Sequence, residues 1–368
     1  MRPETEGELA EAIRGATGPL AVRGGGTRGI AVAGEALSLA GLSGITLYEP
    51  GALTLVAGAG TPLAEVEAAL AAEGQRLAFE PMDHRGLMGT AGEPTLGALF
   101  AANISGPRRI QVGAARDFLL GVRFVDGAGR VVKNGGRVMK NVTGYDLVKL
   151  MAGAHGTLGV LSEVALKVLP RPETEASLRV AVPDAGAAVR LMSQALGSPF
   201  DVTGAAYDPA AGAVLVRVEG FADAVAYRLG RLEAQLAAVG ESARLEAEAS
   251  VAVWRAIRDV EAFHGAAGDV WRLSCKPSEA PEVAARIGAE ALLYDWGGGL
   301  IWALVAPGMD LRARAGRYDG HATLVRADAA TFERLGRFQP QPAPLVALAA
   351  GLRAKFDPKG ILNPGLMG

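Results

Sequence analysis

The chain has 368 residues, 50% of them hydrophobic, and a formal net charge of −2. Its length exceeds what one hydrophobic core usually serves, so we expect two domains. The near-neutral charge gives no electrostatic basis for binding nucleic acid or an anionic membrane surface, and no apolar run reaches the ~18 residues that a membrane span needs. Residues 1–13 carry no secretory signal, which predicts a cytoplasmic protein.

Cysteine and histidine are too sparse to predict a metal centre. Cys275 is the only cysteine, so the chain has no internal disulfide and cannot by itself ligate an iron–sulfur cluster that needs four thiolates. The four histidines, at positions 84, 155, 264 and 321, lie far apart in the sequence. No two of them have the short spacing of a metal motif, and we therefore predict no metal site.

Residues 1–74 predict a small unit of helices and strands. Thr5 and Glu8 form a capping box ahead of a helix whose apolar residues recur at helical spacing. Strands are predicted at 20–22, 45–48 and 53–56. Thr61 and Pro62 are predicted as the N-cap and first position of a second helix, which ends at Gly74.

The run Leu20–Gly29 (LAVRGGGTRG) is the most informative stretch of this unit. Three consecutive glycines follow a short apolar strand, and without Cβ atoms their backbone N–H groups can converge on a closely approaching ligand. Arg23 and Arg28 bracket the glycines and Thr27 adds a hydroxyl. These features favour a polyanion such as a diphosphate, although a plain glycine-rich turn remains an alternative.

Two common nucleotide motifs fit this run less well. Gly24, Gly26 and Gly29 satisfy G-x-G-x-x-G, and Glu49 lies where a Rossmann fold would have its ribose-binding acid. That fold requires a helix that begins at the glycines, whereas residues 30–44 show no helical stripe. No Lys-Ser or Lys-Thr pair follows, which excludes a P-loop. A phosphate-binding loop between strands fits better.

Residues 76–113 are predicted to be mostly loop, with one short helix near Pro94–Asn103. Thr95–Ala98 begins this helix, so free N–H groups at its N-terminus would favour an anion and supply a second half of a phosphate cradle. Strands at 118–125 and 130–132 follow, joined by a glycine-containing turn.

A second glycine loop is predicted within Met139–Leu169. A short helix at 145–151 runs into the segment AGAHGTLG at 152–159, after which residues 160–169 alternate as a strand. Small residues at this spacing predict either a bend with positive φ or a place where a ligand lies against bare backbone.

Pro170–Glu173 (PRPE) predicts a linker, because two prolines block a helix and remove sheet donors. Beyond it, strands are predicted at 176–182, 202–207, 213–218, 269–275, 291–296 and 300–305. Helices are predicted near 184–196, 222–239, 250–264 and 279–287. This pattern indicates an antiparallel sheet with helices on one face, ferredoxin-like in arrangement.

Within the strand at 269–275, alternation sends Trp271 and Leu273 to one face and Arg272 and Ser274 to the other. If Arg272 points inward, its guanidinium can clamp a carboxylate with two hydrogen bonds. The alternative is a solvent-facing arginine near a strand edge. Arg272 is thus the candidate catalytic residue, and the sequence identifies no general base.

Five segments in register resemble one protein family. They are RGGGTRG (23–29), EPTLGALFAANISGP (93–107), RDFLLGVRFVDGAGRVVKNGG (116–136), KNVTGYDLVKLMAGAHGTLGVLSEVALKVLPRP (140–172) and FDPKGILNPG (356–365). Together they resemble the FAD-binding family of vanillyl-alcohol oxidase (PCMH) type. More narrowly, the chain resembles the FAD-binding subunits of bacterial glycolate oxidases, over about residues 1–172 and 336–368.

The resemblance implies an α+β fold. A PCMH-type FAD-binding domain would span 1–172, with subdomains of about 1–74 and 75–172, and a smaller antiparallel-sheet, ferredoxin-like cap domain would span 173–335. Residues 336–368 would return to the FAD domain.

The resemblance also implies bound FAD, held without a covalent bond because the loop position of a tethering histidine is occupied by Gly26. Asn363 would lie near the isoalloxazine. Many relatives carry TIGG where this chain has TLGA at 95–98. The cofactor-binding residues implied are Arg23, Gly24, Gly25, Gly26, Thr27, Arg28, Gly29, Pro81, Thr95, Leu96, Gly97, Ser105, Gly106, Gly156, Thr157, Leu158, Gly159, Val160 and Asn363.

Two functions from different classes remain open. One is an independent FAD-dependent dehydrogenase of a small 2-hydroxy acid such as glycolate. The other is an FAD-binding subunit of a glycolate oxidase complex, with a larger catalytic flavoprotein and an iron–sulfur subunit as partners, and peripheral to the inner membrane through that complex. Relatives that oxidise 2-hydroxy acids carry a histidine-rich metal motif in a longer cap. Its absence here favours the subunit.

Overall fold

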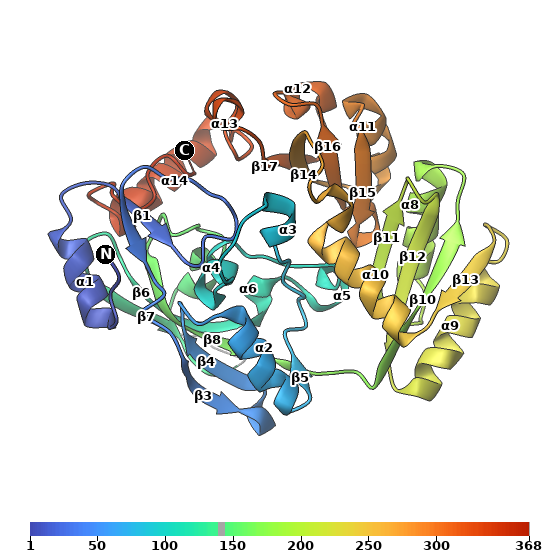
Figure 1. The fold of residues 1–368 in the computed structure, drawn as a ribbon, viewed down its shortest axis with the longest axis horizontal. Coiled ribbons are helices and arrows are strands. Elements are labelled where there is room, and N and C mark those ends of the chain that lie inside the picture. Colours follow the sequence, from blue (N-terminus) through green and yellow to red (C-terminus); the bar gives the residue numbers. More distant parts are fainter. Residues whose placement is uncertain (139–143, 368) are drawn as a thin grey trace. The chain divides into compact units, whose positions relative to one another are not determined.

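The computed structural model describes residues 1–138 and 144–367 (Figure 1). The chain forms two compact units. The first contains Met1–Ser105, Gly113–Arg171 and Pro340–Gly368, and the second contains Gly106–Val112 and Pro172–Gln339. Residues 106–112, expected in the FAD domain, belong by their contacts to the second unit. Residues 139–143, where the fourth of the resembling segments begins, lie outside the described residues.

The main sheet of the first unit has five antiparallel strands in the order β3–β4–β8–β6–β7. Val122 and Val164 lie opposite each other on β6 and β8 and are buried, as the alternating pattern predicts. The strands are β3 (Ile45–Glu49), β4 (Thr54–Gly58), β6 (Leu119–Val125), β7 (Val131–Gly135) and β8 (Val160–Lys167).

A separate pair of parallel strands holds the start of the first glycine loop. β1 (Leu20–Arg23) pairs with β2 (Glu35–Ser38) from Leu20↔Glu35 to Arg23↔Ser38. Leu20 also bridges Leu362 in a parallel sense, so β1 lies between β2 and the C-terminal segment. The sequence analysis missed β2, because a strand of four residues with one buried side chain shows no clear alternation.

Short helices and loops complete the first unit. The N-terminal helix α1 is capped as predicted, since Glu8 N–H donates to Thr5 Oγ1 at 3.2 Å. α2 begins at Leu63 rather than at Pro62, which is its N-cap. A two-residue pair joins β5 (Gln75–Arg76) to β9 (Leu169–Pro170). The helices are α1 (Glu6–Gly15), α2 (Leu63–Ala72), α3 (Arg85–Met88), α4 (Leu96–Ala101), α6 (Ala115–Phe118), α7 (Leu147–Met151) and α14 (Ala343–Phe356), with the 3₁₀ turn η1 (Pro50–Ala52).

The second unit is built on one eight-stranded antiparallel sheet in the order β13–β10–β12–β11–β15–β16–β14–β17. Its six inner strands match the predicted ones, whereas the two edge strands β13 and β17 were missed. The strands are β10 (Thr174–Ala181), β11 (Val202–Asp208), β12 (Ala213–Gly220), β13 (Ser242–Leu245), β14 (Asp269–Cys275), β15 (Ala291–Asp295), β16 (Leu300–Val305) and β17 (Gly320–Arg326).

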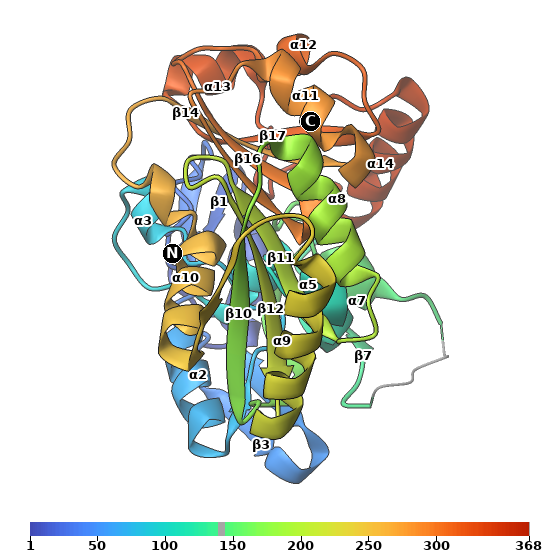
Figure 2. The ribbon, with the colours of Figure 1, turned by 90° about the vertical axis from the view of Figure 1, so that its right-hand side faces the viewer.

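Helices cover both faces of this sheet, which corrects the prediction of helices on one face. Leu178 and Leu229 belong to one apolar core between β10 and α9. The next side chain along β10, Ser177, points the other way and accepts a hydrogen bond from Trp254 Nε1 of α10 at 2.8 Å. Figure 2 shows α9 and α10 on opposite sides of β10 and β12.

The helices of this unit are α5 (Arg109–Val112), α8 (Ala185–Leu196), α9 (Ala222–Leu236), α10 (Ala247–Asp259), α11 (Ala280–Ile287), α12 (Leu311–Ala315) and α13 (Ala329–Leu335). Single 3₁₀ turns are η2 (Glu261–Phe263), η3 (Pro277–Glu279) and η4 (Trp296–Gly298). Throughout residues 1–138 and 144–367, no helix is long and apolar enough to cross a membrane.

Candidate functional site

The first unit contains a pocket with a volume of about 370 Å³, within the range of small-molecule and cofactor sites. Four segments line it: residues 21–32 with Leu39, the helix α4, the loop and strand at 155–161 with Met151, and the C-terminal residues 363 and 366. Six of the lining residues are glycines, which expose bare backbone to the pocket. They are Gly24, Gly26, Gly29, Gly97, Gly156 and Gly159.

The glycine loop presents unused backbone donors to this pocket. Among the residues that the structure describes, none accepts a hydrogen bond from the N–H groups of Gly24, Gly26 or Thr27. Gly26 has φ +74°, and a Cβ added there would point into open space. Consecutive N–H groups without protein acceptors form a ready site for phosphate oxygens. This supports a ligand-binding loop over a plain turn.

Gly24 and Gly25 are required for a different reason. A Cβ on Gly25 would overlap the backbone carbonyl of Glu93, and a Cβ on Gly24 would overlap the hydroxyl of Thr95. The sequence pattern alone predicts that these glycines allow the close approach of a diphosphate. The structure shows that they also let the segment at 92–95 pack directly on the loop.

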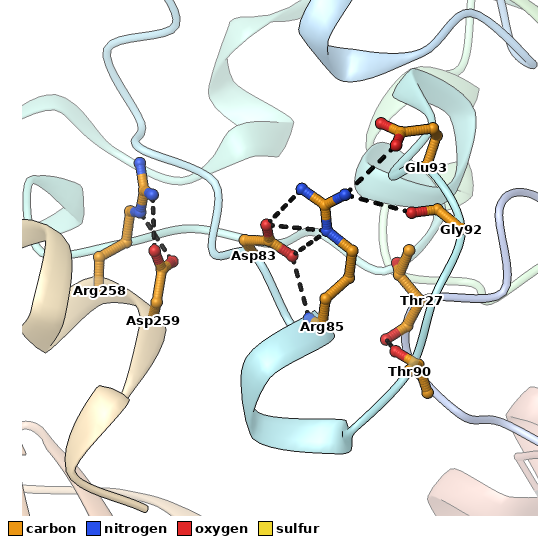
Figure 3. Close-up of polar contacts among 8 residues, drawn as sticks. All are labelled: Thr27, Asp83, Arg85, Thr90, Gly92, Glu93, Arg258 and Asp259. Atoms are coloured by element: carbon orange, nitrogen blue, oxygen red, sulfur yellow. Dashed lines mark hydrogen bonds and ion pairs between the residues drawn. The ribbon is translucent and has the colours of Figure 1, made fainter. Parts of the chain in front are cut away.

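The neighbouring segment, residues 83–93, braces the glycine loop through Thr90 (Figure 3). Thr90 Oγ1 donates to the carbonyl of Thr27 at 2.7 Å. Arg85 binds Asp83 through its Nε and Nη2 atoms, with Nη2 at 2.8 Å, and reaches the carboxylate of Glu93 at 3.3 Å. Hydrogen bonding to Asp83 raises the pKa of Arg85. The ion pairs therefore fix the loop that carries Thr90.

Asn363 joins the glycine loops to the C-terminal segment. Its side chain is buried, accepts from Val22 N–H at 2.8 Å and donates to the carbonyl of His155 at 2.9 Å. Its backbone N–H donates to Leu20 at 3.0 Å, and its φ is +44°, a conformation that asparagine tolerates better than most residues. Gly156 lies against it, since a Cβ there would come 3.1 Å from Asn363 Nδ2.

The lining of the pocket is positively charged and otherwise apolar. Arg23 and Arg28 line it, and among its lining residues there is no Asp or Glu. His155 Nδ1 lies 3.5 Å from Arg28 Nη1. Ile30 and Val32 follow the glycine loop and add an apolar wall. A long anionic ligand with an aromatic part matches this combination.

The N-terminus of α4 does not offer all the donors that were predicted. Leu96 N–H donates to Thr61 and Gly97 N–H to Ala59, at 3.0 and 2.8 Å. Gly97 lies close against Ala59, so it serves the packing of α4 on the end of β4. Two of the N–H groups expected to bind an anion are therefore already used within the protein.

The structure brings together most of the predicted cofactor residues. The pocket is lined by Arg23, Gly24, Gly26, Thr27, Arg28, Gly29, Gly97, Gly156, Gly159, Val160 and Asn363. Predicted residues of the first unit outside its lining are Gly25, Pro81, Thr95, Leu96, Ser105, Thr157 and Leu158. Gly106 and Arg272 belong to the second unit.

Some of these remaining residues have internal roles. Thr157 Oγ1 donates to Ala154 at 2.7 Å, and Ser105 Oγ accepts from Ala115 N–H at 2.9 Å. The hydroxyl of Thr95 is buried, and no described residue forms a hydrogen bond with it. Sequence reasoning missed His155 and the apolar wall after Gly29. The run IAVA at 30–33 was the available signal for that wall.

Comparison with known proteins agrees with this geometry. A family profile described as "FAD binding domain" matches residues 1–135. The fold is similar to that of alkyldihydroxyacetonephosphate synthase, with a TM-score of 0.71, 15% sequence identity, and coverage of 99% of this chain and 76% of that one. The fold and the site therefore define an FAD-binding protein, and the residues present fit FAD.

The sequence comparison narrows the class. The chain is 36% identical over 354 residues to glycolate oxidase subunit GlcE of Escherichia coli (strain K12), covering 95% of this chain and 92% of that protein. The chain is also 34% identical over 104 residues to glycolate oxidase subunit GlcD of Bacillus subtilis (strain 168), a match that covers 28% of this chain and 22% of that protein. The chain belongs to the GlcE family of FAD-binding proteins, and its cofactor is FAD.

Proposed function

We propose that this chain is the FAD-bearing subunit of a complex that oxidises glycolate, a 2-hydroxy acid, to glyoxylate and passes the electrons onward. The observation that carries the proposal is the pocket around the glycine loop, in a chain similar to GlcE over nearly its whole length. The unused N–H groups of Gly24, Gly26 and Thr27 suit a diphosphate, and Arg23 and Arg28 suit its charge.

The chain's own residues position the cofactor. The glycine loop would hold the diphosphate of FAD, while Asn363 keeps that loop in register with the second loop at His155. Bound FAD supplies the two-electron acceptor that oxidation of a 2-hydroxy acid requires. Gly156, Gly159 and Val160 line the same pocket. We propose that they form the wall that packs against the cofactor.

The pocket supplies no well-placed general base. Among the described residues that line it there is no carboxylate, and the imidazole of His155 contacts Arg28. Abstraction of a proton from a hydroxyl needs a base within hydrogen-bond reach. This favours a subunit whose substrate is turned over by a partner, over the alternative of an independent 2-hydroxy-acid dehydrogenase.

The exposed apolar side chains of helix α14 support the proposal of a partner protein. None of its 14 residues is buried, and Leu345, Val346 and Leu348 are 51%, 52% and 63% exposed. A helix of this length is only marginally stable in water without a packed apolar face. We propose that another chain covers it, and that the partners are a larger flavoprotein similar to GlcD and an iron–sulfur subunit.

The test is to purify the chain alone and with these partners. We expect about one FAD per chain from its visible spectrum, little bleaching by anaerobic glycolate alone, and rapid bleaching in the complex. Full glycolate turnover by the isolated chain, unchanged by partners, would support the independent enzyme instead. A chain without FAD would refute both functions.

A further inference from the structure

One face of the second unit's sheet carries hydrogen-bonding side chains. Trp271 and Leu273 of β14 are fully buried in the core, so Arg272 and Ser274 point to the opposite face. On the neighbouring strands, Trp302 pairs with Arg272 and His321 pairs with Ser274. Four polar or aromatic groups from β14, β16 and β17 thus share this face.

A strained tryptophan joins them. Trp296 begins η4 with φ +54°, a left-handed conformation that is rare for a bulky residue and is found mostly where function or tight packing requires it. Its indole Nε1 donates to the carbonyl of Gly106 at 3.0 Å. The guanidinium carbons of Arg109 and Arg272 lie 4.6 and 4.9 Å from its ring centroid.

Arg109 comes from the strap, which is the segment Gly106–Val112. The strap is held on the second unit by the bond from Trp296 and by a buried ion pair between Arg108 and Glu219. These two contacts tie the strap to η4 and to Glu219 at the end of β12. The position of Arg109 beside Arg272 is therefore built into the fold.

Positive charge outweighs negative charge in this cluster. Burial and the neighbouring Arg109 lower the pKa of Arg272 to about 10, while Asp295 partly offsets this effect. Burial, Arg272 and Arg109 lower the pKa of His321. Within the described part of the chain, Arg272 has no hydrogen bond or ion pair. A guanidinium that lies beside other positive groups, and whose own N–H donors have no acceptor among the described residues, favours binding of an anion; here that guanidinium is Arg272.

We propose that Arg272, Arg109 and His321, set against Trp296 and Trp302, form a binding site for a small organic carboxylate in the second unit. A planar carboxylate can take two parallel hydrogen bonds from the Arg272 guanidinium, and the indole rings suit a short carbon skeleton. Ser274 and His321 can bind an oxygen on the adjacent carbon. The choice of glycolate or glyoxylate as the carboxylate rests on the proposed function.

The site has a built-in spectroscopic probe. The chain contains four tryptophans, and two of them, Trp296 and Trp302, lie in the cluster. Acetate, glycolate, glyoxylate and inorganic phosphate would each be titrated into the purified full chain, with intrinsic fluorescence and calorimetry as readouts. We expect the three carboxylates to bind, glycolate and glyoxylate more tightly than acetate, and phosphate at least about tenfold more weakly.

Matched variants separate this site from general charge. Arg272→Gln should weaken carboxylate binding at least about tenfold. The affinity of Arg272→Lys should lie between those of Arg272→Gln and the parent, because lysine keeps the charge but cannot donate two parallel hydrogen bonds. Arg179→Gln is the control, since Arg179 is an exposed arginine of β10 in the same sheet. It should leave binding unchanged. Circular dichroism melts would show that each variant is folded.

Each outcome decides the proposal. Binding that Arg272→Gln leaves intact in a folded chain would overturn it, and so would phosphate binding as tight as that of glyoxylate. FAD content is measured separately on the same samples. Carboxylate binding in a chain that cannot hold FAD would refute only the proposed function, whereas normal FAD without carboxylate binding would refute only this site.

Discussion

The side-chain oxygen of Asn363 accepts a hydrogen bond from the backbone N–H of Val22, although 341 positions separate the two residues in the chain. The amide nitrogen of the same side chain donates to the carbonyl of His155. One buried side chain therefore links the strand before the first glycine loop to the second glycine loop. The shape of the cofactor pocket depends on this link.

We expect Asn363→Ala to destabilise the apo chain by about 2 kcal/mol, because a buried donor and a buried acceptor lose their partner. FAD occupancy should fall with it. Asn363→Asp keeps the acceptor for Val22 but loses the donor to His155, so its stability should lie between those of the parent and of Asn363→Ala. Asn363→Gly removes both bonds while easing the positive φ, so stability equal to that of the parent would contradict this account. Urea unfolding and the FAD absorbance provide the measurements.

Gly25 and Gly26 are adjacent but should fail in different ways. Gly25→Val should lower the melting temperature of the apo chain strongly, because its side chain overlaps the Glu93 backbone. Gly26→Val faces open pocket space and should cost about 1–2 kcal/mol from its φ of +74° while abolishing FAD binding. Thermal melts with and without added FAD separate the two effects. A stable, FAD-loaded Gly25→Val protein would show that the packing described here is wrong.

The FAD should be released by acid precipitation, since we predict no covalent bond to it. Cys275 is buried in the core of the second unit, where burial raises the pKa of its thiol to about 11, so it is a poor nucleophile. His155 is the one histidine among the described residues that line the pocket, and it contacts Arg28. Yellow colour should appear in the supernatant. Colour left in the pellet of the parent but not of His155→Gln would identify a histidyl link.

His321 should make stability depend on pH in one direction. Its pKa is lowered in the folded chain, so the unfolded chain binds a proton more readily. The free energy of unfolding should therefore decrease as the pH falls through the unfolded pKa of about 6.5 toward the lower folded value, and the penalty is complete below that value. Unfolding of the parent and of His321→Asn between about pH 5 and pH 7.5 tests this, with the variant losing that part of the slope. An identical slope in both would contradict it.

Bound carboxylate should reverse part of this effect. A negative charge beside Arg272 and His321 favours protonated imidazole, so the pKa of His321 should rise when glyoxylate is present. Nuclear magnetic resonance titration of the imidazole measures the change directly. In Arg272→Gln, glyoxylate should raise the pKa of His321 less, because the anion binds more weakly to this variant.

Replacing the apolar side chains of α14 should affect assembly rather than folding. Leu345→Asp combined with Leu348→Asp removes two exposed leucines, so the melting temperature of the isolated chain should change little. Recovery of the partner flavoprotein in co-purification should fall sharply. Exposed Val251 of α10 offers a matched control, and Val251→Asp should leave assembly intact. Normal assembly of the double variant would exclude α14 from the interface.

Local patterns were sufficient to predict much of the fold. The strands β6 and β8 could be predicted because each is long, at seven and eight residues, and its apolar residues recur at strand spacing. β2 could not be predicted, since its pairing with β1 depends on a partner in the chain and not on its own four residues. The same holds for the edge strands β13 and β17.

The candidate site was predictable where it depends on backbone freedom. The glycines at 24–26 and 156–159 indicate close approach by themselves, but the sequence cannot say whether a ligand or another segment approaches, and for Gly25 the structure shows Glu93. The grouping of Arg109, Trp296 and Arg272 depends on how distant strands and the strap meet. No spacing in the sequence encodes that contact.

The division of the chain into two units also sets the order in which the units can fold during synthesis. The ribosome makes Pro172–Gln339, nearly all of the second unit, before it makes Pro340–Gly368, which finishes the first. Leu362, which pairs with β1, and Asn363, which lines the cofactor pocket, are therefore made after the second unit. A nascent chain that has not yet reached Asn363 therefore lacks a closed pocket, and loading of FAD reports that translation has passed this residue.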